Sequence, residues 1–597
     1  MLLISPVFLA LGLFIPGFFV AKGLGLKLQW ASGFPISMVV LFYSVFWLGI
    51  FRAPIALWTV LPCLLAVSAA AAWWARKSAI PAKTGAALPL ATADRILILS
   101  SGFVGAALLV RIALSPLIGQ DTLFRWDFLA QKLLAPGGFA FYPPLNPADF
   151  RTYFFVDGIP PLVSFTHWWL YASAGRYLPP LTCVLAAAQF VCTLAFTYGA
   201  ASAVFSRRAG VLAAAMLAAC PLYFRSVVIE QETGLTALAF AAMLYFVVTA
   251  RRESGVSAMV AAGLAAALCA LSREYGWIAL IAGAIALLWR RQPRKQVLIF
   301  AAVAAAAAAP WYVRNWILAG NPFYSLRFGA FAVNPIHDGI LQYYSSVVGV
   351  NQWTSDTCAG LLCYLLLFAA LQILAGIPGG FTGFRQRGYL SIAALLLGAV
   401  WIQSAGYTSA GIETSTRVLS PALVVLSITG AGFLEPLTRR ARWQKALLAA
   451  IVLLQIWTVV QGSVYPYSPF DLRPGQWLQV AFRPVPKPTE FQISDQLAGI
   501  LPAGSRVLSE NAYLHAALSA KGIEVVPVWS PEVRFIFSSS PEESEGRLRS
   551  LRIETVAYYP QSLNTRYLAA SSPFYASLPQ RWHLLARAPG LLDILHP

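Results

Sequence analysis

Two aspartates in the segment SPLIGQDTLFRWDFLAQKLL combine an acidic side chain with an aromatic, apolar setting. On a helix, the spacing of Asp121 and Asp127 turns them about 120° apart, so they cannot form one tight chelating pair. A carboxylate held beside aromatic rings at a membrane face has a raised pKa and suits a general base. The simpler interpretation is that Asp121 caps the following helix or pairs with Arg125 four residues later.

Two further segments place charges between apolar runs. VVIEQETGLTALAF contains Glu230 and Glu232, and Glu232 stands at a helix start, where a carboxylate is stabilised by the helix dipole. LSREYGWIAL contains Arg273, Glu274 and Tyr275 at a turn. The two charges of that turn can simply neutralise each other. An arginine at the depth of lipid headgroups is also suited to binding a lipid phosphate.

Two more arginines stand near the ends of apolar runs. Arg314 lies in PWYVRNWILAGNPFYSL and Arg417 in ETSTRVLSPALVVL. An aromatic belt with a turn explains the first segment apart from its arginine, and a snorkelling side chain explains the second. Phosphate binding is the alternative for Arg417. The five histidines show no metal-ligand spacing and no serine stands in G-x-S-x-G, which disfavours metalloproteases and serine hydrolases.

The composition identifies lipid as the main solvent of the chain. Of its 597 residues 58% are hydrophobic and 11% are charged, and the mean hydropathy is +0.66. These values exclude a soluble enzyme, a disordered chain and a disulfide scaffold. The formal charge of +19 comes from short basic clusters between apolar runs, the positive-inside pattern, and not from a basic face for nucleic acid.

About fourteen segments are long and apolar enough to span a membrane, and the basic clusters between them all fall on one face, which we expect to be cytoplasmic. The first apolar run lacks signal-peptide features and is interpreted as a retained span. The predicted spans are 2–21, 34–51, 55–74, 95–114, 179–205, 209–225, 233–250, 256–272, 275–290, 296–313, 358–377, 388–404, 417–434 and 444–462.

The remaining segments fall on the opposite, extracytoplasmic face. Two long outer loops, 115–178 and 314–357, are rich in aromatic residues and proline. In the tail, 463–597, RVLSE, EVVPVW, TVAYYP and WHLLARA read as short strands, with helices over 494–501 and NAYLHAALSAKG. This pattern predicts a small α/β domain. It has no glycine-rich phosphate loop, so a lid or acceptor platform is favoured over a nucleotide site.

In this order the motifs resemble the GT-C fold membrane glycosyltransferases, among them bacterial relatives of protein O-mannosyltransferases and of the transferase that adds aminoarabinose to lipid A. The motifs are GQDTLFRW, EQETGLTALAF, LSREYGW, PWYVRNWILAGNPFY and TRVLSP. The resemblance covers about 95–460, so the expected architecture is a mostly α bundle with accessory spans in 1–94, a catalytic core in 95–462 and the α/β tail. Relatives often carry adjacent acidic residues in the first loop, whereas Asp121 stands between Gln120 and Thr122. Asp127 therefore stays an alternative base.

The resemblance implies transfer of a sugar from a polyprenyl-phosphate donor to an envelope glycan, lipid or protein at the outer face of the cell (inner, cytoplasmic) membrane. Asp121 is the implied base and Glu232 orients the acceptor or sugar. The phosphate and the substrate are implied to contact Arg273, Glu274, Tyr275, Arg314 and Arg417. We expect an inverting single displacement without a cofactor; a divalent metal between carboxylates is possible chemically but disfavoured.

Two other classes share these features. A lipid or saccharide transporter or flippase would also have many spans with charges at membrane depth, but the chain shows no internal repeat and its charges gather at one face and not at the midplane. An assembly scaffold would use the spans only as an anchor, and the acidic residues of the outer face argue against it.

Overall fold

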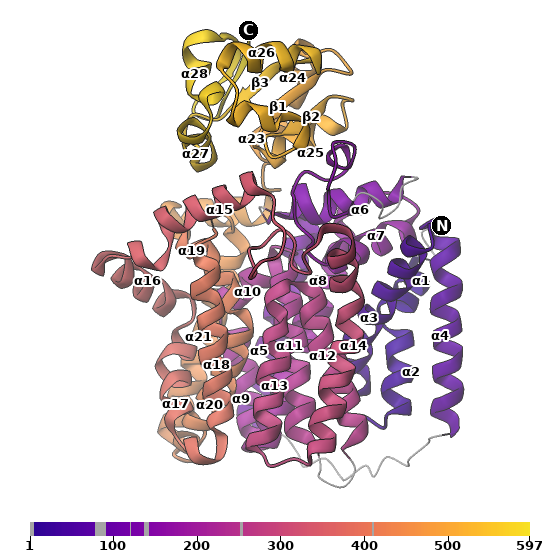
Figure 1. Cartoon of the computed structure of the whole chain (residues 1–597). Helices are drawn as coiled ribbons and strands as arrows, with labels where there is room; N and C mark the ends of the chain where they lie inside the picture. Colours follow the sequence, from indigo (N-terminus) through magenta and orange to yellow (C-terminus); the bar gives the residue numbers. More distant parts are fainter. Residues whose placement is uncertain (1–4, 78–90, 120, 136–141, 251–254, 409–410) are drawn as a thin grey trace.

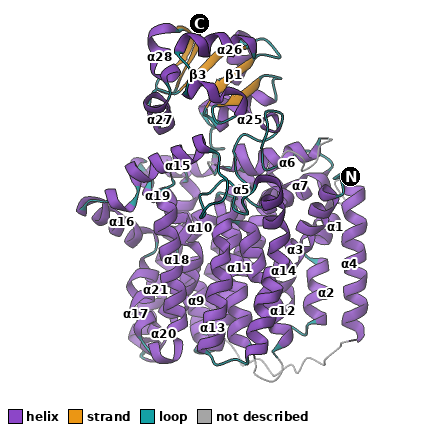
Figure 2. Ribbon diagram, in the orientation of Figure 1, coloured by secondary structure: helices purple, strands orange, loops and turns teal. Residues whose placement is uncertain are grey.

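The computed structural model describes residues 5–77, 91–119, 121–135, 142–250, 255–408 and 411–597. The residues outside these ranges include Gln120, which precedes Asp121, and the basic residues Lys83, Arg251 and Arg252. The chain folds into a long helical bundle with a small α/β domain on one of its ends (Figure 1). Figure 2 shows the strands gathered in that domain.

Nine helical segments within the described residues are long and apolar enough to cross a membrane. Three bent helix pairs raise this number to twelve, and two shorter apolar helices, α12 (Val256–Ser272) and α13 (Ile278–Trp289), pack beside them. By length and composition, the described helices thus provide fewer spans than the fourteen expected. The long helices are α3 (Gln29–Ile50), α4 (Leu57–Lys77), α5 (Thr92–Leu114), α8 (Thr182–Val204), α11 (Glu232–Thr249), α14 (Arg294–Ala319), α18 (Phe384–Ala405), α20 (Ser420–Leu434) and α21 (Ala441–Val464).

The bent pairs differ most from the sequence prediction. α1 (Ser5–Leu13) and α2 (Ile15–Gly23) meet at 41°, and α9 (Arg207–Ala218) and α10 (Pro221–Val228) at 64°. The predicted span 358–377 is divided by a 98° bend between α16 (Ser355–Phe368) and the segment Gln372–Phe381, which includes α17 (Ile377–Phe381). The Gln372 amide donates inside the bundle to Met216 O and Ser427 Oγ, both at 2.9 Å, and holds the second arm there while α16 projects sideways.

Two basic clusters of the described residues lie at the end of the bundle that faces away from the α/β domain. Helices α11, α13 and α20 all start at the end below that domain and run away from it (Figure 1). The clusters that follow α13 and α20, Arg290–Arg291 and Arg439–Arg440, are therefore at the far end. The structure thus separates the cations and the outer segments as the positive-inside pattern requires.

Three short helices from the predicted outer loops lie between the bundle and the α/β domain. They are α6 (Asp127–Leu134), α7 (Leu162–Ala174) and α15 (Pro335–Val348). α7 is buried along almost its whole length, whereas α15 is amphipathic and exposes polar residues. These helices and the loops around them cover the outer ends of the spans.

The C-terminal domain (residues 489–597) contains one five-stranded sheet in the order β2-β1-β3-β5-β4. β1 (Arg506–Ser509) pairs in parallel with β2 (Glu524–Pro527) and β3 (Ile553–Tyr558), and β5 (Leu592–His596) pairs antiparallel with β3 and with β4 (His583–Ala588). The four predicted strands are confirmed, and β5 is an additional strand that lies between β3 and β4. The helices are α23 (Thr489–Gln492), α24 (Ser494–Ile500), α25 (Ala512–Ser519), α26 (Pro541–Ser550), α27 (Leu563–Ser571) and α28 (Pro573–Arg581).

A buried arginine fastens the linker of this domain to the bundle. Arg111, in the last turn of α5, is 2% exposed and donates to Tyr465 O at 2.6 Å and, more weakly, to the carbonyls of Ala481 and Arg483. Tyr465 precedes α22 (Pro474–Phe482), whereas Ala481 and Arg483 stand at its C-terminal end. One guanidinium therefore closes the linker into a loop on the outer end of α5.

We predict that Arg111→Gln loosens this attachment without unfolding the bundle. Hydrogen bonds to a charged group contribute about 1.5–3 kcal/mol each, so their loss should expose 465–490 to protease. Limited proteolysis of the detergent-solubilised protein measures the effect as faster release of the C-terminal domain. Arg95→Gln, at the exposed far end of the same helix, is the control. Equal cleavage of both variants would contradict the anchoring role.

Candidate active site

A cavity of about 800 Å³ lies where the outer ends of the spans meet the underside of the C-terminal domain. Its wall alternates acidic and basic side chains from elements far apart in the sequence. These charged lining residues are Asp121, Asp157, Glu232, Glu274, Glu510, Arg125, Arg273 and Arg417. Tyr275 and His337 line the same space. The cavity therefore brings together six of the eight residues predicted for the site.

One charge pair of the cavity joins Asp121 to Arg417. Arg417 Nη2 lies 2.6 Å from Asp121 Oδ2, and Arg417 Nη1 donates to Gln231 Oε1 at 2.6 Å. Asp121 begins a π-helical turn whose first residue, Thr122, donates to Ile229 O at 2.6 Å. The two loops that carry Asp121 and Gln231 are thus bonded to each other, which presents both side chains to one arginine.

This pairing changes the chemistry expected for Asp121. Burial raises the pKa of its carboxyl, but the charges of Arg417 and Arg125 and the hydrogen bond from Arg417 outweigh burial, so the pKa lies below the ordinary aspartate value. The expectation of a raised pKa for Asp121 is therefore wrong, because its partner is an arginine and not aromatic rings alone. Asp121 is a carboxylate at neutral pH, and its proton affinity depends on what Arg417 binds.

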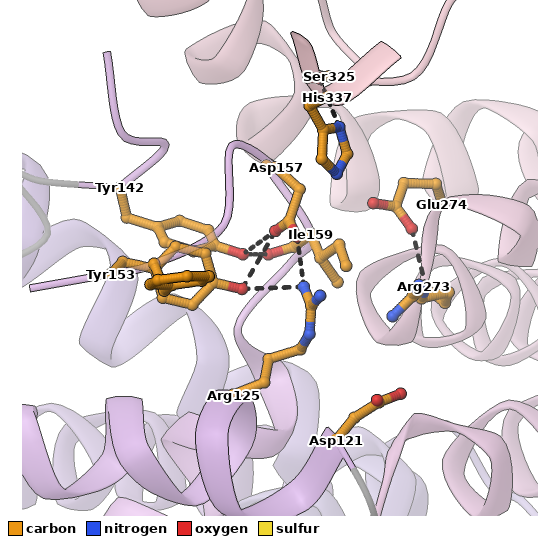
Figure 3. Close-up of polar contacts among 12 residues, drawn as sticks. Asp121, Arg125, Tyr142, Tyr153, Asp157, Ile159, Arg273, Glu274, Ser325 and His337 are labelled. Atoms are coloured by element: carbon orange, nitrogen blue, oxygen red, sulfur yellow. Dashed lines mark hydrogen bonds and ion pairs between the residues drawn. The ribbon is translucent and has the colours of Figure 1, made fainter. Parts of the chain in front are cut away.

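A second group of charges centres on Arg273, at the end of α12. Its Nη1 lies 3.7 Å from Glu232 Oε1 and its Nε lies 3.2 Å from Glu274 Oε2. Glu232 is the first residue of α11, so the helix N-terminus adds to the stabilisation of its charge. The predicted mutual neutralisation within the turn is present, but Arg273 also reaches across to a second helix. Arg273, Glu232 and Glu274 all line the cavity, and Figure 3 shows Arg273 paired with Glu274.

Arg125 is held by the outer loop and not by Asp121. Its Nη1 forms an ion pair with Asp157 and donates to Tyr153 Oη at 2.9 Å, while Tyr142 and Tyr153 donate to Asp157 Oδ1 at 3.3 and 3.1 Å. Figure 3 shows this network on one side of the cavity, opposite Arg273 and Glu274. The predicted i,i+4 pair between Asp121 and Arg125 is replaced because the π-helical turn changes their relative direction.

The loop that carries Asp157 is fixed by its next residue. Gly158 O accepts hydrogen bonds from Trp311 Nε1 at 2.7 Å and Asn315 Nδ2 at 2.8 Å. A Cβ at Gly158 would lie 2.5 Å from the Asn315 amide, so no larger residue fits without a shift. The segment PWYVRNW of α14 therefore positions the Asp157 loop.

Asp127 lies outside the lining of the cavity. It is fully buried, and its two oxygens accept from Tyr171 at 2.5 Å, Tyr177 at 2.8 Å and Gln131 at 2.7 Å. Burial raises the pKa of Asp127, and the three donors oppose that rise. These contacts join α6 to α7 and assign Asp127 a structural position.

Arg314 is also absent from the cavity lining. Its guanidinium lies over the Trp311 ring, 5.1 Å from the ring centre, on the wall of α14. Glu230, the acidic neighbour of Glu232, accepts from the backbone N–H of Leu117 and so supports the loop that leads to Asp121. Both residues support elements around the site.

Sequence inspection missed three lining residues that the structure adds. Asp157 stands in the same aromatic outer loop as Asp121, and the argument from charge at membrane depth would have found it. His337 Nδ1 contacts Ser325 Oγ at 3.1 Å. Glu510 is the last residue of the predicted strand RVLSE, and an acidic residue at the end of an apolar strand was the available signal. The described residues contain no group of three or more His, Cys, Asp or Glu arranged to hold a metal ion.

Comparisons with known proteins bear on this geometry. Residues 159–313 match the family model described as dolichyl-phosphate-mannose-protein mannosyltransferase, a segment that includes Glu232, Arg273, Glu274 and Tyr275. The structure of ArnT from Cupriavidus metallidurans in the apo state has a TM-score of 0.51 at 13% identity, over 85% of this chain and 98% of that one. The chain has the GT-C fold. The resemblance inferred from the motifs is confirmed at the level of the fold.

Two further solved structures are similar at lower TM-scores. The archaeal oligosaccharyltransferase AglB from Archaeoglobus fulgidus, in complex with an inhibitory peptide and a dolichol-phosphate, has a TM-score of 0.49 at 14% identity, over 81% of this chain and 72% of that one. Arabinofuranosyltransferase AftD from Mycobacteria has a TM-score of 0.45 at 16% identity, over 78% and 36%. A search of curated protein sequences finds no match. The fold assignment therefore depends on ArnT and the family match.

The positions of Asp121 and Asp127 lead to opposite expectations for their amide variants. In Asp127→Asn, an oxygen that accepts hydrogen bonds is replaced by an NH2 group, which faces the buried donors of Tyr171, Tyr177 and Gln131. The free energy of unfolding should therefore fall by roughly 1–3 kcal/mol. Thermal unfolding in detergent measures this loss. Asp121→Asn should unfold within a few degrees of the wild type, because its side chain is partly exposed to the cavity. The reverse order of stabilities would contradict the structural position of Asp127.

Proposed function

We propose that the protein transfers a sugar from a polyprenyl-phosphate donor to an acceptor in this cavity, at the extracytoplasmic face of the cell membrane. The observation that best supports this proposal is that Arg125, Arg273 and Arg417 line one cavity at the outer ends of apolar helices, each within ion-pair distance of a carboxylate group. Guanidinium groups bind phosphate with two parallel hydrogen bonds, and apolar helices suit an isoprenoid chain. The GT-C fold supports the same reaction class.

The donor phosphate is proposed to bind Arg417 and Arg273. Asp121 pairs with Arg417, and Glu232 and Glu274 pair with Arg273. An incoming phosphate competes with these carboxylates for the guanidinium edges. When it takes Arg417, Asp121 loses its strongest stabilising contact and its proton affinity rises. Donor binding would thereby convert a paired carboxylate into a general base.

The chemical step is then a single displacement at the anomeric carbon. The acceptor oxygen forms a bond to this carbon while its proton moves to Asp121. The bond from the anomeric carbon to the phosphate oxygen breaks, and its electron pair leaves with polyprenyl phosphate. Arg417 and Arg273 stabilise the charge on the leaving oxygen, and the anomeric configuration is inverted. Glu232, Glu274 and Tyr275 face the same space and would orient the sugar or the acceptor.

No metal is part of this proposal. Each carboxylate of the membrane wall, Asp121, Asp157, Glu232 and Glu274, is within ion-pair distance of an arginine. The arginines supply the positive charge that a divalent cation would bring to the leaving phosphate. We therefore expect the same rate of transfer with and without EDTA.

The proposal predicts separable effects of Asp121 and Arg417. With the purified protein in nanodiscs, a panel of polyprenyl-phosphate sugars and mixed envelope acceptors, the released polyprenyl phosphate is measured. Asp121→Asn should lower the turnover number about 10²–10⁴-fold, the range for loss of a general base. Arg417→Lys keeps the positive charge but loses the planar guanidinium group that binds phosphate with two parallel hydrogen bonds. This variant should raise KM for the donor about tenfold or more.

Arg151→Lys is the matched control, because Arg151 lies in the same outer loop as Asp121, exposes most of its side chain and is not part of the cavity lining. Its KM for the donor should stay at the wild-type value. Equal release by wild type and Asp121→Asn would remove Asp121 from the mechanism. If folded protein binds these lipids but releases no polyprenyl phosphate from any donor, the transferase proposal fails in favour of a transporter.

A further inference from the structure

The sheet of the C-terminal domain has a topological switch point that faces the cavity. In the order β2-β1-β3 the chain moves from β1 to one neighbour, β2, and then crosses to the other neighbour, β3. Right-handed crossovers in opposite directions place the intervening helices on opposite faces of the sheet. The loops that follow β1 and β3 therefore diverge at the carboxyl ends of these strands. Open α/β sheets bind their ligands at this position.

The residues of these two loops line the same cavity as Asp121 and Arg417. Glu510 and Asn511 follow β1, and Gln561 and Asn564 follow β3. We call these four residues the switch-point crevice. Asn511 is committed within the domain, because its Nδ2 donates to Glu490 Oε1 at 3.0 Å and its Oδ1 caps α25. Asn564 Oδ1 accepts a hydrogen bond from Tyr344 Oη, so Glu510, Gln561 and the amide nitrogen of Asn564 are the groups that can contact a ligand.

The Glu510 carboxyl group is buried but only one of its oxygens is hydrogen-bonded. It is 3% exposed, its Oε1 accepts from Thr565 Oγ1 at 2.7 Å, and its Oε2 has no hydrogen-bond partner among the described residues. Burial raises the pKa of Glu510 to about 7, although the hydrogen bond from Thr565 opposes this rise. A small rotation about the last side-chain bond, whose profile is broad, turns the unpartnered oxygen toward the crevice.

The charges on the two sides of the cavity differ. The lining arginines all come from the membrane part, whereas the C-terminal domain contributes Glu510 and neutral polar and aromatic groups. A carboxylate accepts hydrogen bonds, and amides both donate and accept. An anionic headgroup is disfavoured beside Glu510. The rings of Tyr513 and Trp529 border the same space and offer flat apolar faces.

We propose that the switch-point crevice binds the hydroxyl groups of a saccharide acceptor, with Glu510 as the principal hydrogen-bond acceptor. This inference rests on the proposed transferase function, since it names the class of molecule that receives the sugar. A saccharide supplies the donors that Glu510 lacks and both donors and acceptors for Gln561 and Asn564. Bound there, it lies between the C-terminal domain and the membrane wall that carries Asp121.

Binding to a glycan array tests the inference without any turnover. Fluorescently labelled full-length protein in nanodiscs is applied to immobilised glycans and, in parallel, to immobilised serine- and threonine-containing peptides. The wild type should bind at least one glycan class, and the affinity for it, titrated in solution, should fall tenfold or more in Glu510→Gln. Glu524→Gln is the matched control, because Glu524 lies at the other end of the same sheet beside Arg506.

Stability separates a binding defect from a folding defect. Burial disfavours the ionised form of Glu510, so Glu510→Gln should unfold at pH 8 at a temperature equal to or above that of the wild type. Should it not fold, Asn564→Ala must give the same loss of glycan binding. Absence of glycan binding, equal affinity of wild type and Glu510→Gln, or peptide binding that depends on Glu510 would each overturn the saccharide assignment. Glycan binding without donor cleavage would contradict only the transferase function.

Discussion

The arrangement of the outer cavity depends on ion pairs between guanidinium and carboxylate groups that are largely buried. Removing two charges from water is costly, and it is offset only when each charge meets a well-placed partner. Asp121 and Arg417 are 296 residues apart, yet they meet at 2.6 Å. Every element that carries a member of these pairs must therefore keep its place, because one displaced member leaves a buried charge uncompensated.

This constraint explains the supporting contacts around the cavity. Thr122 and Gln231 bond the first outer loop to the start of α11, and Trp311 and Asn315 hold the loop of Asp157. From above, Trp529 Nε1 donates to Phe154 O at 2.7 Å, and Asn334 Nδ2 donates to Trp529 O at 3.0 Å. The C-terminal domain is thus bonded to both outer loops, and it limits the water that reaches the charges below.

Much of this arrangement follows from residue types and spacing. Apolar runs located the long helices within a few residues, and alternation in the tail located four of the five strands. The short motifs at span ends predicted six residues of the cavity, because a charge at the membrane face has few stable positions. The 98° bend after α16 was not predictable, since it depends on the contacts of Gln372 inside the bundle.

Partners were harder to predict than positions. The spacing of Asp121 and Arg125 favoured a helical pair, but a π-helical turn and the distant Arg417 and Asp157 changed both partners. The same limit applied to Asp127, whose tyrosine donors come from α7 and the segment after it. Long-range tertiary contacts decide which carboxylate faces the cavity, and local periodicity contains no information on them.

The most direct measurement is a cryo-EM map of the full chain in nanodiscs with a bound polyprenyl phosphate. The account predicts phosphate oxygens within about 3.2 Å of the guanidinium groups of Arg417 or Arg273, with Asp121 released from Arg417. A headgroup bound outside the cavity, or inside it with the Asp121–Arg417 pair intact, would contradict the exchange of partners on which the proposed mechanism depends.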